Sequence, residues 1–109
     1  MRYLMTSLVN EDDAPPTEAL YAEMAKFIEE TTAAGILLST GGLERGGTRV
    51  TSFGDEITVV DGPFTEAKEA VGGFALVEVS SKEEAIELAR RFRRIVGDGV
   101  SLVYQVMGP

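Results

Sequence analysis

The spacing of apolar residues divides this chain into strands that alternate with helices. Residues 2–9 form an alternating stretch rich in strand-forming types, and they predict a first strand that closes before two consecutive prolines. Thr17 then follows as a suitable N-cap, and a helical pattern continues until Gly35 ends it. The apolar stripe of this predicted helix consists of Leu20, Met24, Phe27, Ile28 and Thr31.

A second strand and helix follow in the last third of the chain. Residues 73–79 predict a strand, and Ser81 with Glu84 three residues later predicts a capping box at the start of a helix. The helix should end at Gly97, before a final strand over residues 100–107. The predicted buried stripe of this helix consists of Ala85, Leu88, Ala89, Phe92 and Val96.

Between the first predicted helix and the strand over residues 73–79, the pattern predicts strands only. Residues 36–43 predict a strand, and residues 48–53 and 56–60 predict a hairpin that bends at Gly54 and Asp55. The element order is therefore strand, helix, strand, hairpin, strand, helix, strand. This order predicts an α+β chain with a ferredoxin-like split βαβ arrangement and an inserted β-hairpin. With 109 residues, the chain is expected to form a single domain over 1–109.

The predicted strands are apolar on both of their faces, although two helices can cover only one face of such a sheet. The first strand places Leu4 and Leu8 opposite Tyr3, Met5 and Val9, and the strand over 73–79 places Phe74 and Leu76 opposite Ala75, Val77 and Val79. A sheet that faces water on one side normally carries polar residues there. We therefore expect a homodimer that buries roughly 2,000 Å² in total.

Composition excludes several classes of function. The net charge of −8 argues against a nucleic-acid partner, because such binding depends on Lys and Arg. No apolar run is long enough to span a bilayer and no signal peptide is evident, so we expect a cytoplasmic protein without a membrane partner. The chain has neither Cys nor His, which removes thiol chemistry, the commonest general base and the usual soft metal ligands. We expect no metal and no cofactor.

The stretch ITVVDGPFTEAKEAVGGF, residues 57–74, contains the most distinctive local pattern. Pro63 fixes its own φ and restricts Gly62, so the chain should leave the preceding strand along a rigid path that aims Asp61 and Phe64 reproducibly. The paired glycines at 72–73 predict a β-bulge. In the simplest interpretation, Asp61 accepts hydrogen bonds from nearby backbone amides in the turn, and Phe64 fills part of the core.

These residues, together with Gly41-Gly42-Leu43 earlier in the chain, resemble the YCII-related, or DGPF-domain, family of small bacterial proteins. The resemblance extends over essentially the whole chain. It implies a dimeric α/β barrel in which two ferredoxin-like sheets pack face to face. It also implies a regulatory setting, because members often accompany sigma factors of the extracytoplasmic type. The family's enzymatic branch pairs a His with an Asp in the dimer cleft, and this chain contains no His.

The candidate site follows from the rigid turn and from the first two strands. Asp61 is the candidate catalytic group, because a buried carboxylate with a raised pKa can act as a base near neutral pH. The candidate ligand-binding residues are Tyr3, Ser7, Ser39, Asp61, Phe64 and Lys68, with Arg2 as a further neighbour. In the simpler interpretation Lys68 is a solvated charge.

Three functions remain open from the sequence. The first is a small-molecule-binding homodimer with a regulatory role. The second is a cofactor-independent lyase or isomerase that uses Asp61 in the dimer cleft. The third is a protein-interaction module that docks through its sheet face and through the Arg-rich end of the second helix. At that helix end, residues 90–94 carry four arginines, and Glu87 is expected to pair with Arg91 on a solvated surface.

Overall fold

The computed structural model describes residues 1–10, 13–62, 64 and 69–108. Its elements are β1 (Arg2–Asn10), α1 (Glu18–Ala33), β2 (Leu37–Gly42), β3 (Thr48–Phe53), β4 (Glu56–Asp61), β5 (Glu69–Glu78), α2 (Lys82–Val96) and β6 (Val100–Gln105). Their type and order are those predicted from the sequence. The principal differences are at the ends: β5 begins at Glu69 rather than at residue 73, and β6 ends at Gln105 rather than at 107.

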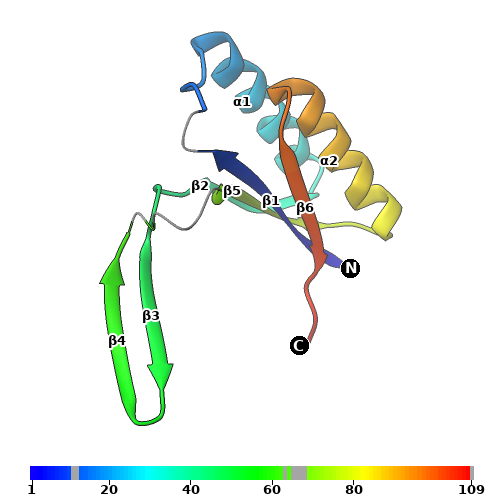
Figure 1. Ribbon diagram of the computed structural model, residues 1–109. Coiled ribbons are helices and arrows are strands. Elements are labelled where there is room, and N and C mark those ends of the chain that lie inside the picture. Colours follow the sequence, from blue (N-terminus) through cyan, green and yellow to red (C-terminus); the bar gives the residue numbers. More distant parts are fainter. Residues whose placement is uncertain (11–12, 63, 65–68, 109) are drawn as a thin grey trace.

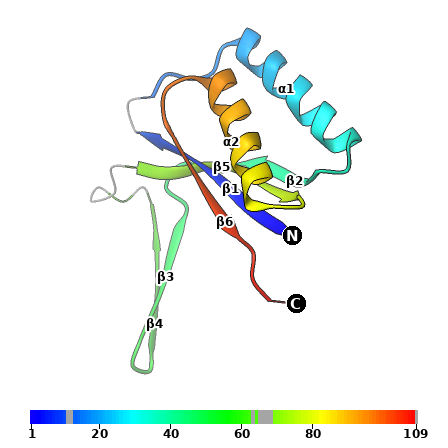
Figure 2. The same cartoon turned by 90° about the vertical axis from the view of Figure 1, so that its right-hand side faces the viewer.

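Four of the strands form one antiparallel sheet in the order β2-β5-β1-β6. Helix α1 connects β1 to β2, and β5 lies between these two strands, which is the split βαβ arrangement. The architecture is therefore α+β and is compatible with a ferredoxin-like fold. Both helices lie on the same side of this sheet, as the two views in Figures 1 and 2 show.

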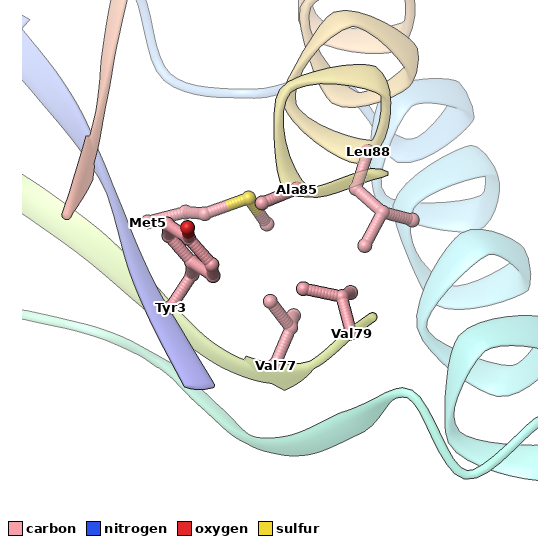
Figure 3. Packing of buried hydrophobic residues seen from close by; sticks show 6 residues of the cluster. All are labelled: Tyr3, Met5, Val77, Val79, Ala85 and Leu88. Atoms are coloured by element: carbon pink, nitrogen blue, oxygen red, sulfur yellow. The ribbon is translucent and has the colours of Figure 1, made fainter. Parts of the chain in front are cut away.

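The hydrophobic core lies between the sheet and the helices. Its buried residues are Tyr3, Met5, Val77, Val79, Ala85 and Leu88 (Figure 3). Because side chains alternate along a strand, burial of Tyr3 and Met5 fixes which face of β1 the helices cover. The even-numbered residues of β1 must then point to the other side of the sheet.

Both helices begin at the residues that the sequence predicts. The Thr17 hydroxyl accepts a hydrogen bond from the Leu20 amide at 3.2 Å, and the Ser81 hydroxyl accepts one from the Glu84 amide at 3.2 Å. The capping box of α2 differs from the prediction in its second half. The Glu84 carboxylate accepts hydrogen bonds from the amide and hydroxyl of Ser80, at 3.0 and 2.6 Å, one residue before the N-cap.

The paired glycines at 72–73 form the predicted bulge. Ser7 of β1 pairs with Gly73 and Leu8 pairs with Val71, so Gly72 is the extra residue on β5. A Cβ atom on Gly72 would collide with the side chain of Val9. Glycine is therefore required here by the close approach of the two central strands.

Strands β3 and β4 form a separate two-stranded sheet, which we call the arm (residues 48–61). The arm extends away from the body on the side of the four-stranded sheet that is opposite the helices (Figures 1 and 2). All residues of both strands are exposed. The predicted hairpin is confirmed, but it is a projection rather than a part of the main sheet.

Candidate functional site on the open sheet face

The side of the four-stranded sheet that faces away from the helices is apolar, and we call it the open face. It is formed by Leu4, Thr6 and Leu8 of β1, Phe74 and Leu76 of β5, and Val100, Leu102 and Tyr104 of β6. Most of these side chains are half-buried by their neighbours, whereas Tyr104 is 53% exposed. In the described part of the chain, no helix covers this surface.

Thr6 lies at the centre of the open face, between Phe74 on β5 and Leu102 on β6. Its hydroxyl oxygen is inaccessible to solvent and has no hydrogen-bond partner among the described residues. A buried hydroxyl without a partner costs free energy relative to one that is paired. Because neighbouring side chains shield this oxygen, a group on the open face could restore the missing hydrogen bond only after the Thr6 side chain rotated about χ1.

The β2 edge of the open face contains small residues. Ser39 pairs with Leu76 and is exposed, and Gly41 pairs with Phe74. A Cβ atom on Gly41 would lie 3.1 Å from the Phe74 ring, so the glycine leaves room for this ring beside β2. The Thr40 hydroxyl also donates a 2.8 Å hydrogen bond to the Phe74 carbonyl and fixes the strand pairing at this point.

One end of the open face carries opposite charges. The guanidinium of Arg2 lies 3.6 Å from the Glu78 carboxylate, and the Met1 ammonium lies 3.0 Å from it. The hydrogen bond from this ammonium, followed by the nearby positive charges, lowers the pKa of Glu78. This carboxylate is exposed and paired, and it lacks the raised pKa that a general base would need.

Tyr3 and Ser7 lie on the helix-covered side of β1, away from Ser39. Tyr3 is 4% exposed and belongs to the core. The Ser7 hydroxyl accepts a 3.3 Å hydrogen bond from the Arg93 guanidinium. Tyr3 and Ser7 are therefore separated from Ser39 by the sheet itself, so the structure does not bring these three predicted ligand-binding residues together.

Asp61 ends β4 at the base of the arm. Its carboxylate accepts a 2.9 Å hydrogen bond from the Thr48 hydroxyl on β3, and the side chain is exposed. Phe64, three residues later, lies beneath the Arg49 guanidinium, whose central carbon is 3.9 Å from the ring centroid. Both residues therefore contact the start of β3. Lys68 and Pro63 fall outside the described residues.

The backbone of the turn also contacts the loop that leads into β3. The Gly62 amide donates a 2.8 Å hydrogen bond to the Gly47 carbonyl. A Cβ atom on Gly62 would lie 2.6 Å from the Gly46 carbonyl oxygen, which is closer than a side chain allows. Asp61, Gly62 and Phe64 thus join the end of the arm to its beginning.

Arg93 behaves differently from the other arginines of α2. Its guanidinium donates hydrogen bonds to the hydroxyls of Ser7 and Ser101 at 3.3 Å and to the Gly97 carbonyl at 2.8 Å, so it connects α2 to β1 and β6. The sequence pattern predicts a solvated charge for Arg93 and gives no indication that it connects α2 to the strands. No sequence signal separates Arg93 from its neighbours, since the contacts come from distant strands.

The remaining arginines of α2 form surface ion pairs. Arg90 and Arg94 both pair with Glu87, at 3.1 and 3.7 Å. Arg91 pairs with Glu30 of α1 at 3.3 Å and lies over the Phe27 ring, so the predicted pair between Glu87 and Arg91 is wrong. The contacts of Arg91 with Glu30 and Phe27 link α2 to α1 at their exposed edges.

The described surface has open depressions beside α2 and beside the arm. A depression of about 530 Å³ lies between α2 and β6 and is lined by Arg90, Arg93, Arg94 and apolar residues of both elements. A second one, of about 350 Å³, lies beside the base of the arm. Within the described ranges no cluster of three or more acidic residues could hold a metal ion, and neither helix has the length and apolarity needed to cross a bilayer.

Comparisons with known proteins identify the family. The profile of the YCII-related domain matches residues 1–108. An uncharacterised protein of Rhizobium meliloti (strain 1021) is 32% identical over 91 residues, which cover 73% of this chain and 63% of that protein. The match thus spans less than two thirds of the relative's length. Because the profile covers nearly every residue, from β1 to the end of β6, the chain belongs to the YCII-related family.

Proposed function

We propose that this protein is a cytoplasmic bacterial homodimer that binds a small molecule between the open faces of its two subunits and acts in regulation. The observation that carries the proposal is the apolar open face with the unpartnered Thr6 hydroxyl at its centre. Two open faces that close around each other as a barrel, rather than packing flat with interdigitated side chains, would leave an apolar chamber with a few polar groups between them. Such a chamber is typical of small-molecule sites.

The residues around Thr6 indicate the class of ligand. Phe74 and Leu102 flank its hydroxyl, and Ser39 supplies a second hydroxyl at the β2 edge. Such a surface suits a mainly apolar organic molecule with one or two groups that can hydrogen-bond. The charged residues Arg2 and Glu78 stand at one end of the strands and already pair with each other.

The first test is the oligomeric state. Sedimentation velocity over a wide range of concentrations should show a dimer at micromolar concentrations. A monomer at every concentration would contradict the proposal, because each open face would then remain in water. A thermal-shift screen of metabolites follows, since a ligand that binds only the folded state at 100 times its Kd stabilises it by about 2.7 kcal/mol.

Thr6→Val tests the site itself. Valine keeps the shape of threonine and removes only the unpartnered hydroxyl, so the dimer should persist and its melting temperature should stay the same or rise. The ligand-induced shift should decrease. A full shift in Thr6→Val together with a lost shift in Asp61→Asn would instead favour a ligand site beside Asp61. Binding of a substrate by Asp61→Asn without its conversion would favour the enzyme. A dimer that binds no metabolite would favour the interaction module.

A further inference from the structure

The arm carries an apolar face of its own. Val50 pairs with Val59 and Ser52 pairs with Ile57, so these four residues point to the same side of the hairpin. We call Val50, Ile57 and Val59 the arm face. Their exposed fractions are 65%, 70% and 65%. Each is a β-branched residue suited to a strand with a packed surface, yet in the described chain nothing covers it.

An uncovered hairpin of this kind is not stable by itself. Two-stranded hairpins are marginal in water, and they need a further strand or a packed surface to become stable. The arm strands pair only with each other and do not join the main sheet. An exposed apolar ribbon is also an aggregation hazard. A surface that covers the arm face would remove both problems.

The base of the arm is closed by contacts between its two ends. The contacts between Gly62 and the loop at Gly46 and Gly47 hold its two ends together. The hydrogen bond between Thr48 and Asp61 and the stacking of Arg49 on Phe64 add two side-chain contacts at the same level. These contacts join the ends of β3 and β4 to each other, and Figures 1 and 2 show the direction in which the arm leaves the sheet.

The direction of the arm matches the place where a second subunit would lie. The arm extends on the same side of the sheet as the open face and points away from the helices (Figures 1 and 2). A strand of six residues is about 20 Å long, whereas two sheets packed face to face are only about 10 Å apart. An arm of this length would extend beyond the partner's sheet to the level of its helices.

We propose that the arm is a clasp, in which the arm face packs against a second copy of this chain. The inference rests on the proposed homodimer and specifies what holds it together. In a two-fold dimer the contact occurs twice, because the arm of each subunit packs against the other subunit. The open faces would form the centre of the interface, and the two arms would close its sides.

The area that a stable dimer needs supports a second copy as the occupant. Four strands of about six residues present a flat surface of roughly 400 Å², and one face of the arm adds roughly half as much again. Stable interfaces bury about 800 Å² of accessible surface on each partner. The open face and the arm face together approach that area, and both are apolar surfaces of the same chain.

The charge of the arm disfavours two other occupants. Its tip carries Asp55 and Glu56, and the whole chain has a net charge of −8. Anionic lipid surfaces and nucleic acids attract basic segments, so an acidic tip would be repelled by both. A second copy carries the same net charge of −8, but Val50, Ile57 and Val59 are uncharged, so the arm face itself adds no repulsion between two copies.

The test compares the same substitution at two adjacent positions of β4. Val59→Glu places a carboxylate on the arm face, whereas Val60→Glu places it on the opposite face, beside Arg49. The two variants have equal net charge and equal strand composition. Sedimentation equilibrium should show a dimer Kd raised at least tenfold by Val59→Glu and changed less than threefold by Val60→Glu. Far-UV circular dichroism should show that both variants keep the fold.

Hydrogen exchange of the unsubstituted protein provides a second readout. The amides of residues 48–61 should exchange more slowly at concentrations where the dimer is populated than at high dilution. A dimer whose Kd is unaffected by Val59→Glu, or is weakened equally by both variants, would overturn the clasp while leaving the homodimer intact. A protein that is monomeric throughout would overturn the homodimer and the clasp together.

Discussion

The Thr48 hydroxyl donates a 2.9 Å hydrogen bond to the Asp61 carboxylate across the first residue pair of the arm. The acidic residue that the sequence offers as a catalytic base is therefore engaged in closing the base of a hairpin. Together with Gly62 and Phe64 it joins the end of the arm to its beginning.

Loss of the Asp61 carboxylate should loosen the arm more than the body. Asp61→Ala removes the acceptor for the Thr48 hydroxyl, and because the pair is exposed, the free energy of unfolding should fall by less than about 1 kcal/mol. Hydrogen exchange of the arm amides should accelerate, whereas that of β1 and β5 should not. Asp61→Asn keeps an acceptor oxygen and serves as the control. Equal exchange in the alanine variant and the parent would contradict this role.

A side chain at position 62 should be destabilising. In Gly62→Ala the added Cβ would lie 2.6 Å from the Gly46 carbonyl oxygen, and the backbone must move to relieve the clash. We expect a loss of about 1–3 kcal/mol, the usual cost of overpacking, measured by urea unfolding. Gly42→Ala is the matched control, because its Cβ would lie 3.9 Å from the nearest atom. If both variants unfolded at the same urea concentration, the close approach would not matter.

Truncation of Leu88 should destabilise the whole body. Its side chain is 6% exposed and packs between α2 and the sheet, so Leu88→Ala should cost about 2–5 kcal/mol. Leu43→Ala removes the same atoms from a residue that is 46% exposed and should cost much less. Thermal and urea unfolding of the two variants check the difference. A similar cost at both positions would show that the core is not where the structure places it.

Acid should weaken the start of α2. Hydrogen bonds from the Ser80 hydroxyl, and then from its amide, lower the pKa of Glu84 below the ordinary value of 4.5. The ionised carboxylate therefore stabilises the folded state above pH 4.5, and this contribution is lost as the pH falls through the lowered folded-state pKa. Glu84→Gln should be less stable than the parent at pH 7 and should show a flatter loss of stability below pH 4.5.

Glu83→Gln, on the same helical turn, controls for the removal of one charge. Melting temperatures of the parent and both variants between pH 7 and 3 would reveal the effect. A parallel pH dependence for Glu84→Gln and the parent would show that the contacts with Ser80 do not stabilise the ionised form.

The sequence by itself determined the features that depend on neighbouring residues. Thr17 and Ser81 cap the two helices because a hydroxyl at an N-cap reaches an amide only three residues later. The bulge at Gly72 and the order of the elements were equally predictable, since turn residues and periodicity are local. For the same reason the hairpin was predicted, although its position in space was not.

Only the tertiary structure decided which residues meet. Both faces of β1 are apolar, so the pattern could not tell whether Tyr3 or Thr6 faces the helices, and the packing of α2 placed Tyr3 in the core. Arg93 binds Ser7 for a similar reason, because 86 residues separate two side chains that the fold brings together. Alternation assigns residues to two sides of a strand, but only the elements that pack on one side decide which of them remain available for a partner.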